Sequence, residues 1–243
     1  YIHKLSNTVI MSPTDTWKLS DMFIEPQTGM QYSLGFYKNL MDNQLEASVE
    51  GYYKTMDNLL EYGGVNTLFP PLDSWQHDFH KGKGKAYGME VEAGWKGAST
   101  SLTAYYTLSW SLRRFDAIYH SWYPDRNDNR HKFTIMGSQK LGKGVELYAA
   151  WNWRSGNRMT VESHVYESIK GTLVYYSSPN NIQLPNYQRL DLRANFERTT
   201  RRGNESVWNI SIYNAYCKKN AVFATVEIQE DGSYKGSGKA IFP

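Results

Sequence analysis

The residues best suited to hold a metal ion lie together in His77-Asp78-Phe79-His80. Two imidazoles and a carboxylate are suitable ligands, but the segment lies in 62–82, a polar stretch of loop-like composition where such residues are common. The run Asp125–Asn129 resembles the start of a calcium loop. Arg130 stands where that loop needs glycine, and Met136 stands where it needs glutamate. We therefore predict no metal site and no cofactor.

The sequence does not indicate catalysis. The six histidines are scattered, and no GxSxG motif accompanies them. Glycines and lysines alternate in Gly82–Gly88, without the spacing of a phosphate-binding loop. Cys217 is the only cysteine, which excludes an internal disulfide or a cysteine-based zinc cluster. The net charge of +3, with no basic stripe, gives no support for nucleic-acid binding. We predict a protein that is not an enzyme and has no catalytic residues.

The most informative element is the segment Ser101–Arg113, in which apolar and polar residues alternate. Successive side chains of a strand point to opposite faces, so this pattern predicts a two-faced β-strand. At roughly 3.3 Å per residue, such a segment is long enough to cross the hydrocarbon layer of a bilayer. Its apolar face consists of Leu102, Ala104, Tyr106, Leu108, Trp110 and Leu112.

The same alternation recurs in Lys85–Lys96, Val145–Arg154 and Tyr187–Phe196. The polar faces of these segments carry charged groups as well as Ser and Thr. In a soluble protein such a face meets solvent, whereas in an outer-membrane barrel it lines a wet lumen and the apolar face meets lipid.

Composition is compatible with a membrane barrel. The chain is 15% aromatic, has a mean hydropathy of −0.62 and contains no run of eighteen apolar residues, which excludes a transmembrane helix. A barrel places its hydrophobicity at every second residue, so a low mean does not exclude membrane insertion. Aromatic residues near strand ends fit interfacial belts, although aromatics favour any strand. They are Tyr52, Tyr53, Tyr62, Trp95, Trp110 and Trp153.

The connections alternate between short and long. Tight turns are expected at 41–43, 97–99 and 142–143, with somewhat longer ones at 199–205 and 229–235. Long connections occupy 11–27, 62–82, 114–129 and 156–185. Short turns on one rim and long loops on the other are typical of outer-membrane barrels. The expected strands are 1–10, 28–40, 44–61, 83–97, 100–113, 130–141, 144–155, 186–198, 206–216, 220–228 and 236–242.

The expected number of strands, about eleven, is odd, whereas closed bacterial single-chain barrels have even numbers. An open sheet would leave unpaired edges in the membrane. We therefore predict an all-β fold, an antiparallel transmembrane β-barrel of which the chain is an incomplete portion, with upstream sequence and a final strand missing.

Several segments, in their order and spacing, resemble the C-terminal half of the barrel of TonB-dependent outer-membrane receptors, particularly the Bacteroidota type. They are Leu5–Thr8, Pro13–Trp17, Gly84–Glu90, Tyr105–Ser111, Tyr123–His131, Ser155–Asn157, Tyr187–Arg193 and Asn214–Asn220. The resemblance covers nearly the whole chain. It implies a barrel of about 22 strands that encloses an N-terminal plug. Residues 1–243 would be the C-terminal part of that one barrel domain, without the plug and the final strand.

The resemblance further implies energised uptake of a scarce nutrient (an iron chelate, cobalamin, a glycan or a peptide) in the bacterial outer membrane. The implied partners are outer-membrane lipid, the missing plug and N-terminal part of the barrel, TonB through a segment outside this chain, a surface lipoprotein and the small-molecule ligand. Two alternatives remain: a passive porin-like barrel and a soluble all-β ligand-binding module.

Ligand contact is expected on the long loops, because binding residues concentrate on loops held by a rigid scaffold. Aromatic rings stack on sugars or chelates and arginine binds anions, although the same aromatics fit an interfacial belt or loop packing. The candidates are Trp75, His77, Asp78, His80, Trp122, Tyr123 and Arg126. Candidates to face the plug are Asp125, Arg130, Arg189, Asp191 and Arg193.

Overall fold

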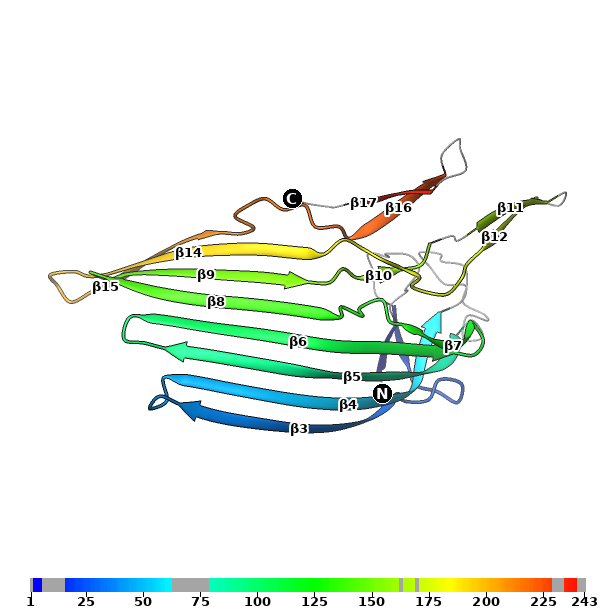
Figure 1. The fold of residues 1–243 in the computed structure, drawn as a ribbon, viewed down its shortest axis with the longest axis horizontal. Coiled ribbons are helices and arrows are strands. Elements are labelled where there is room, and N and C mark those ends of the chain that lie inside the picture. The colour runs from blue at the N-terminus through cyan, green and yellow to red at the C-terminus, as the bar shows by residue number, and fades with distance from the viewer. Residues whose placement is uncertain are drawn as a thin grey trace.

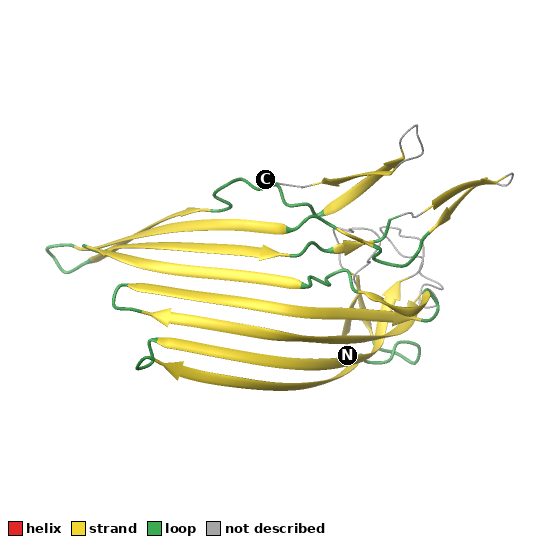
Figure 2. Cartoon of the chain, in the orientation of Figure 1, coloured by secondary structure: helices red, strands yellow, loops and turns green. Residues whose placement is uncertain are grey.

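The computed structural model describes residues 2–5, 16–62, 79–161, 164–168, 171–228 and 234–239. Strands, turns and loops make up this part of the chain (Figures 1 and 2). The strands are β1 (Ile2–Leu5), β2 (Thr16–Leu19), β3 (Thr28–Leu40), β4 (Leu45–Tyr62), β5 (Phe79–Lys96), β6 (Thr100–Phe115), β7 (Tyr119–Pro124), β8 (His131–Gly142), β9 (Val145–Arg154), β10 (Arg158–Met159), β11 (His164–Ser168), β12 (Gly171–Tyr175), β13 (Ile182–Gln183), β14 (Tyr187–Thr199), β15 (Glu205–Ile212), β16 (Phe223–Ile228) and β17 (Tyr234–Lys239). No helix among the described residues is long and apolar enough to cross a membrane.

Eight of these strands form one antiparallel wall, in the order β3, β4, β5, β6, β8, β9, β14 and β15, with β7 added to the end of β6 (Figure 1). Tight turns join the strands at one rim, as predicted. Met41, Asp42 and Asn43 all have positive φ angles, of 53°, 52° and 65°. The same left-handed backbone recurs at Gly142 and Lys143, which explains the Asn, Asp and Gly chemistry of these turns.

The long connections leave and re-enter the wall at the opposite rim, also as predicted, and their described parts contain more strand than expected. β5 begins at Phe79, so His80 lies in a strand instead of the predicted loop. Residues 114–129 include β7, which pairs with the extended end of β6 through Arg113 and Tyr123. The stretches 11–27 and 156–185 likewise contain strands. Each of these pieces is short, so alternation within it is too brief to be recognised in the sequence.

The register aligns the apolar positions of neighbouring strands across the whole wall. One continuous apolar row is Phe36, Val49, Val91, Tyr106, Phe133 and Trp153. The corresponding polar row is Glu50, Glu90, Thr107, Lys132, Arg154 and Tyr187. The wall therefore has one apolar face and one polar face, as the alternation predicted.

The wall buries neither face. Leu34 on the apolar face is 70% exposed and Ile210 is 60% exposed. The fully buried hydrophobic residues in the described part of the chain all lie in the rim loops or in strands at the rim, and they are Ile24, Phe115, Tyr123 and Leu184. An apolar surface of this extent requires an apolar environment, which argues against a soluble module.

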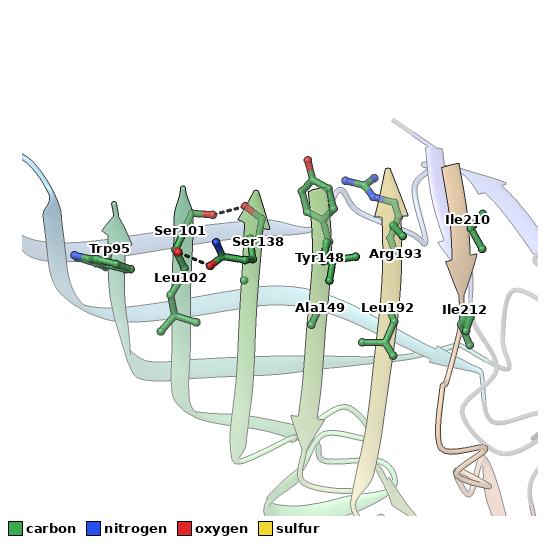
Figure 3. A pocket seen from close by; sticks show the side chains of 15 residues that line it. Trp95, Ser101, Leu102, Ser138, Tyr148, Ala149, Leu192, Arg193, Ile210 and Ile212 are labelled. Atoms are coloured by element: carbon green, nitrogen blue, oxygen red, sulfur yellow. Dashed lines mark hydrogen bonds between the residues drawn. The ribbon is translucent and has the colours of Figure 1, made fainter. Parts of the chain in front are cut away.

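The apolar face is hollowed where small residues alternate with large ones. In the register, Gly137 and Ala149 lie between Leu102 and Leu192, and Ala194 lies between Leu147 and Ile210. These small residues leave a groove of about 560 Å³ on this face (Figure 3). Towards the long-loop rim the same face carries stacked aromatics. The Tyr87 ring lies 6.3 Å from Tyr53 and 5.3 Å from Trp110. This row fits the predicted belt, except that Tyr52 lies on the polar face, opposite Ser33 and Gly88.

The C-terminal strands differ from the prediction. β16 and β17 form a separate hairpin and do not extend the wall. β15 ends at Ile212, and the following segment folds back over the end of β14. Asn220 there bonds both main-chain groups of Gln188, at 2.9 and 3.0 Å. An amide side chain thus takes the place of a neighbouring strand at this position.

Candidate functional site

The most highly connected polar cluster lies at the long-loop rim and is termed the rim network. It links the ends of β6, β8 and β9 through residues of the 124–131 and 155–158 segments. Its members are Arg113, Asp125, Asp128, Asn129, Arg130, Arg154, Ser155, Asn157 and Arg158. It assembles above the wall, where strand pairing ends and main-chain groups need other partners.

Asp128 lies at the centre of the rim network and is 2% exposed. One carboxylate oxygen accepts the Ser111 N–H at 2.9 Å, and the other lies 3.0 Å from Arg130 and 3.5 Å from Arg158. Two guanidinium groups and a main-chain N–H thus compensate one buried charge, as a buried carboxylate requires. Asp128 holds three segments of the chain together.

Asn129 and Asp125 add further links. The Asn129 amide donates to the Ser155 carbonyl at 2.9 Å and to the Asn157 side chain at 2.8 Å. Arg154 donates to the side-chain oxygen Oδ1 of Asn129 at 3.0 Å. Asp125 forms an ion pair with Arg113, and its main-chain N–H bonds the Ser111 carbonyl at 2.8 Å. Asp125 and Arg130 therefore have partners within this chain, and a role facing a plug stays a prediction for them.

The predicted ligand-contact residues of β7 point in different directions. Tyr123 is 2% exposed, and its hydroxyl lies 3.4 Å from Glu61. Burial, followed by the charge of Glu61, raises the pKa of this phenol well above its ordinary value, so Tyr123 acts as a neutral hydrogen-bond donor. Trp122 is 37% exposed, and the Lys85 ammonium lies 4.4 Å from its ring centroid. Lys85 belongs to the apolar-face positions, opposite Leu112.

The other predicted loop residues have varied positions. Arg126 is half-buried, and its carbonyl oxygen accepts the Arg158 N–H at 2.8 Å. His80 pairs with Glu61 in the β4–β5 register. Trp75, His77 and Asp78 lie outside the described residues. Among the residues the structure describes, no three His, Cys, Asp or Glu side chains come together as a metal site.

The polar face carries a second cluster, termed the Arg–Tyr patch, on β9, on β14 and at Tyr213, the residue after β15. In each of three pairs a guanidinium lies over a tyrosine ring: Arg154 over Tyr187 at 4.8 Å, Arg189 over Tyr213 at 4.2 Å and Arg193 over Tyr148 at 4.0 Å. Sequence reasoning proposed Arg189 and Arg193 but missed Arg154 and the three tyrosines. Alternation placed these residues on the polar face, but it does not identify which ones are cross-strand neighbours.

Gly156 allows the rim network to close. A Cβ atom at Gly156 would overlap the carbonyl oxygen of Leu184 and would lie 2.7 Å from that of Pro185. Beside it, the Leu184 N–H donates to the Asn157 carbonyl at 2.8 Å. The two loop segments pack with their main chains in contact, which only glycine permits here.

We predict that Gly156→Ala separates these segments at a cost of about 2 kcal/mol. The Leu184 amide should then exchange with deuterium about thirtyfold faster in the full-length protein. Gly51→Ala is the matched control, because its nearest neighbour would lie at 3.9 Å. Equal exchange in the two variants would contradict the packing role of Gly156.

Comparison with known families agrees with this geometry. Residues 8–215 match the family model described as "TonB dependent receptor-like, beta-barrel". The chain belongs to the TonB-dependent receptor β-barrel family. It is part of an outer-membrane β-barrel, and the receptors of this family are not enzymes. Because such barrels turn their apolar band outwards, the apolar face meets lipid and the polar face meets the lumen.

Solved TonB-dependent receptors share the fold. FpvA, the ferripyoverdine receptor of Pseudomonas aeruginosa, is 15% identical, with a TM-score of 0.54 over 88% of this chain and 26% of its own. The iron transporter FrpB of Neisseria meningitidis is 14% identical, with a TM-score of 0.55 over 91% of this chain and 30% of its own. The ferric-catecholate import receptor Fiu of E. coli K12 is 13% identical, with a TM-score of 0.55 over 90% of this chain and 27% of its own. The present chain thus spans less than a third of these receptors. No curated protein matched the sequence.

Proposed function

We propose that the full-length protein takes up a scarce nutrient through the outer membrane with energy delivered by TonB. The observation that carries the proposal is the wall itself, whose lumen-side polar face is crowded with charged groups below a rim of long loops. Four carboxylates lie on this face in β4 and β5, and the Arg–Tyr patch lies on it farther along the wall. A face of this kind suits a lumen filled by a folded plug.

The proposed ligand class is an iron chelate, cobalamin, a glycan or a peptide. Ferric chelates come first in a test, because the solved receptors that share the fold are a ferripyoverdine receptor, an iron transporter and a ferric-catecholate import receptor. We propose that the ligand meets the rim residues Trp75, His77, Asp78, His80, Trp122 and Arg126, and not Tyr123, which is buried. TonB and a surface lipoprotein are proposed partners of the whole protein.

We predict that cells expressing the full-length gene accumulate one such nutrient saturably, and that an uncoupler or loss of TonB abolishes this uptake. The measurement is uptake of labelled ferric siderophores, cyanocobalamin, oligosaccharides and peptides in turn. Steady ion conductance of the purified full-length protein in planar bilayers, together with non-saturable uptake, would instead identify a passive porin.

In the uptake assay, a Trp75→Ala/Trp122→Ala variant should need at least about tenfold more ligand for half-maximal uptake. An unchanged requirement would remove these two residues from the ligand site.

A further inference from the structure

The charges on the polar face are segregated along the wall. Glu46 and Glu50 of β4 lie beside Glu90 and Glu92 of β5, where Glu50 is directly opposite Glu90. On β8, β9 and β14 cations predominate on the face, with Lys132, Lys140, Arg154, Arg189 and Arg193 against Glu146, Asp191 and Glu197. Between the two regions, the polar positions of β6 from Thr103 to Ser109 are uncharged. A partner in the lumen therefore meets two poles of opposite sign.

Three cations of the basic region have no ion-pair partner among the described residues. Arg189 pairs with Asp191 at 2.8 Å. By contrast, no described carboxylate oxygen lies within 4.0 Å of a charged nitrogen of Lys132, Arg154 or Arg193. Lys132 and Arg154 are also direct cross-strand partners. Like charges placed opposite each other destabilise a sheet, so an anionic partner would relieve a real cost here.

Geometry also prepares these guanidinium groups for carboxylates. The Arg193 guanidinium stacks on the ring of Tyr148, and the Arg154 guanidinium stacks on the ring of Tyr187. A stacked guanidinium is pre-organised, so it loses less side-chain entropy when it binds a carboxylate. Arg193, Asp191, Tyr148 and Tyr213 also line a groove of about 520 Å³ on the polar face. The groove gives an incoming segment of polypeptide a place to lie.

We propose that the polar face of β8, β9 and β14 docks an acidic segment of the plug. The inference rests on the proposed function, since it assumes that the occupant is the plug of a TonB-dependent receptor. The segment must supply carboxylates at two levels, one for Lys132 and Arg154 and one for Arg193. Arg193 is six residues along β14 from Tyr187, the partner of Arg154, so the levels lie roughly 20 Å apart along the strand. The acidic pole on β4 and β5 fixes the orientation, because it would repel the same segment.

The test uses the full-length receptor in detergent. Each variant carries Arg193→Cys, with the native cysteine removed by Cys217→Ser, and one further cysteine at a chosen position in the plug. A short bismaleimide then crosslinks the two cysteines if they lie close together. Crosslinks should form within an Asp- and Glu-containing plug segment. Crosslinking confined to segments without acidic residues would overturn the proposal.

Hydrogen–deuterium exchange then measures how firmly the plug segment is bound to the wall. Lys132→Glu/Arg193→Glu should raise exchange of that plug segment at least about tenfold, and reversal of the crosslinked plug acids to lysine should restore it. Lys54→Glu/Lys96→Glu is the matched control, because it makes the same change of charge on the polar face of β4 and β5, outside the basic region. Equal exchange in the two variants would contradict the docking.

Heat-modifiable gel migration verifies that each barrel is folded. Uptake by the wild-type receptor tests the proposed function separately, so a failure of one is distinguishable from a failure of the other.

Discussion

Ala149→Arg is expected to destabilise the folded barrel by about 2–4 kcal/mol, the cost of an arginine on the lipid face near the bilayer midplane. Ala149 lies in the middle of β9 on the apolar face, where its register partners are Gly137 and Leu192. Lipid around this position would leave a guanidinium without water to hydrate it. The free energy of folding of the full-length receptor into lipid vesicles measures the effect.

The neighbouring residue provides the matched control. Ala150 is in the same strand and carries the same side chain, but it lies on the polar face opposite Asp191. Ala150→Arg places the new charge in the lumen beside a carboxylate, so it should cost less than about 1 kcal/mol. Equal destabilisation by the two variants would show that the assignment of faces to lipid and lumen is wrong. A larger cost for Ala150→Arg would show that it is reversed.

Asp128→Ala is expected to release the rim loops. The substitution removes the carboxylate that Arg130, Arg158 and the Ser111 N–H share, and the two guanidinium groups lose the counter-charge that compensates them. Breaking a buried ion pair from one side typically costs 3–5 kcal/mol. Because both arginines are partly exposed to solvent, we expect about 3 kcal/mol, the low end of that range.

Local opening is the appropriate measurement, since the wall below the rim does not depend on Asp128. Amide exchange in 124–131 and 155–158 of the full-length receptor should rise about a hundredfold. Asp116→Ala is the control, because Asp116 also pairs with an arginine at the rim, Arg114 at 2.8 Å, but with 62% of its side chain exposed. An exposed pair contributes about 1 kcal/mol at most, so this variant should exchange like the wild type. Wild-type exchange rates in Asp128→Ala would show that the rim network does not hold the loops in place.

The wall was predictable from the sequence because its signal is local. The alternation in Ser101–Arg113 requires only that neighbouring side chains of a strand point to opposite faces, and β6 does span Thr100–Phe115. Turns were predictable for a similar reason. Asp42 and Asn43 adopt a left-handed backbone that these residue types tolerate better than most. Alternation and turns together predicted the rims and the two faces, and the resemblance to TonB-dependent receptors assigned the faces to lipid and lumen.

Partnerships between strands were decided only by the tertiary structure. In the sequence, Asp125 was a candidate to face the plug and Asp128 had no predicted role. Their partners Arg113 and Arg158 are twelve or more positions away in the chain and meet them only when β6, β8 and β9 are in register. Arg193 and Tyr148 became neighbours in the same way. The physical reason is that the period of a strand fixes the face of a side chain, whereas its cross-strand neighbour depends on register, which the folded sheet sets over long separations.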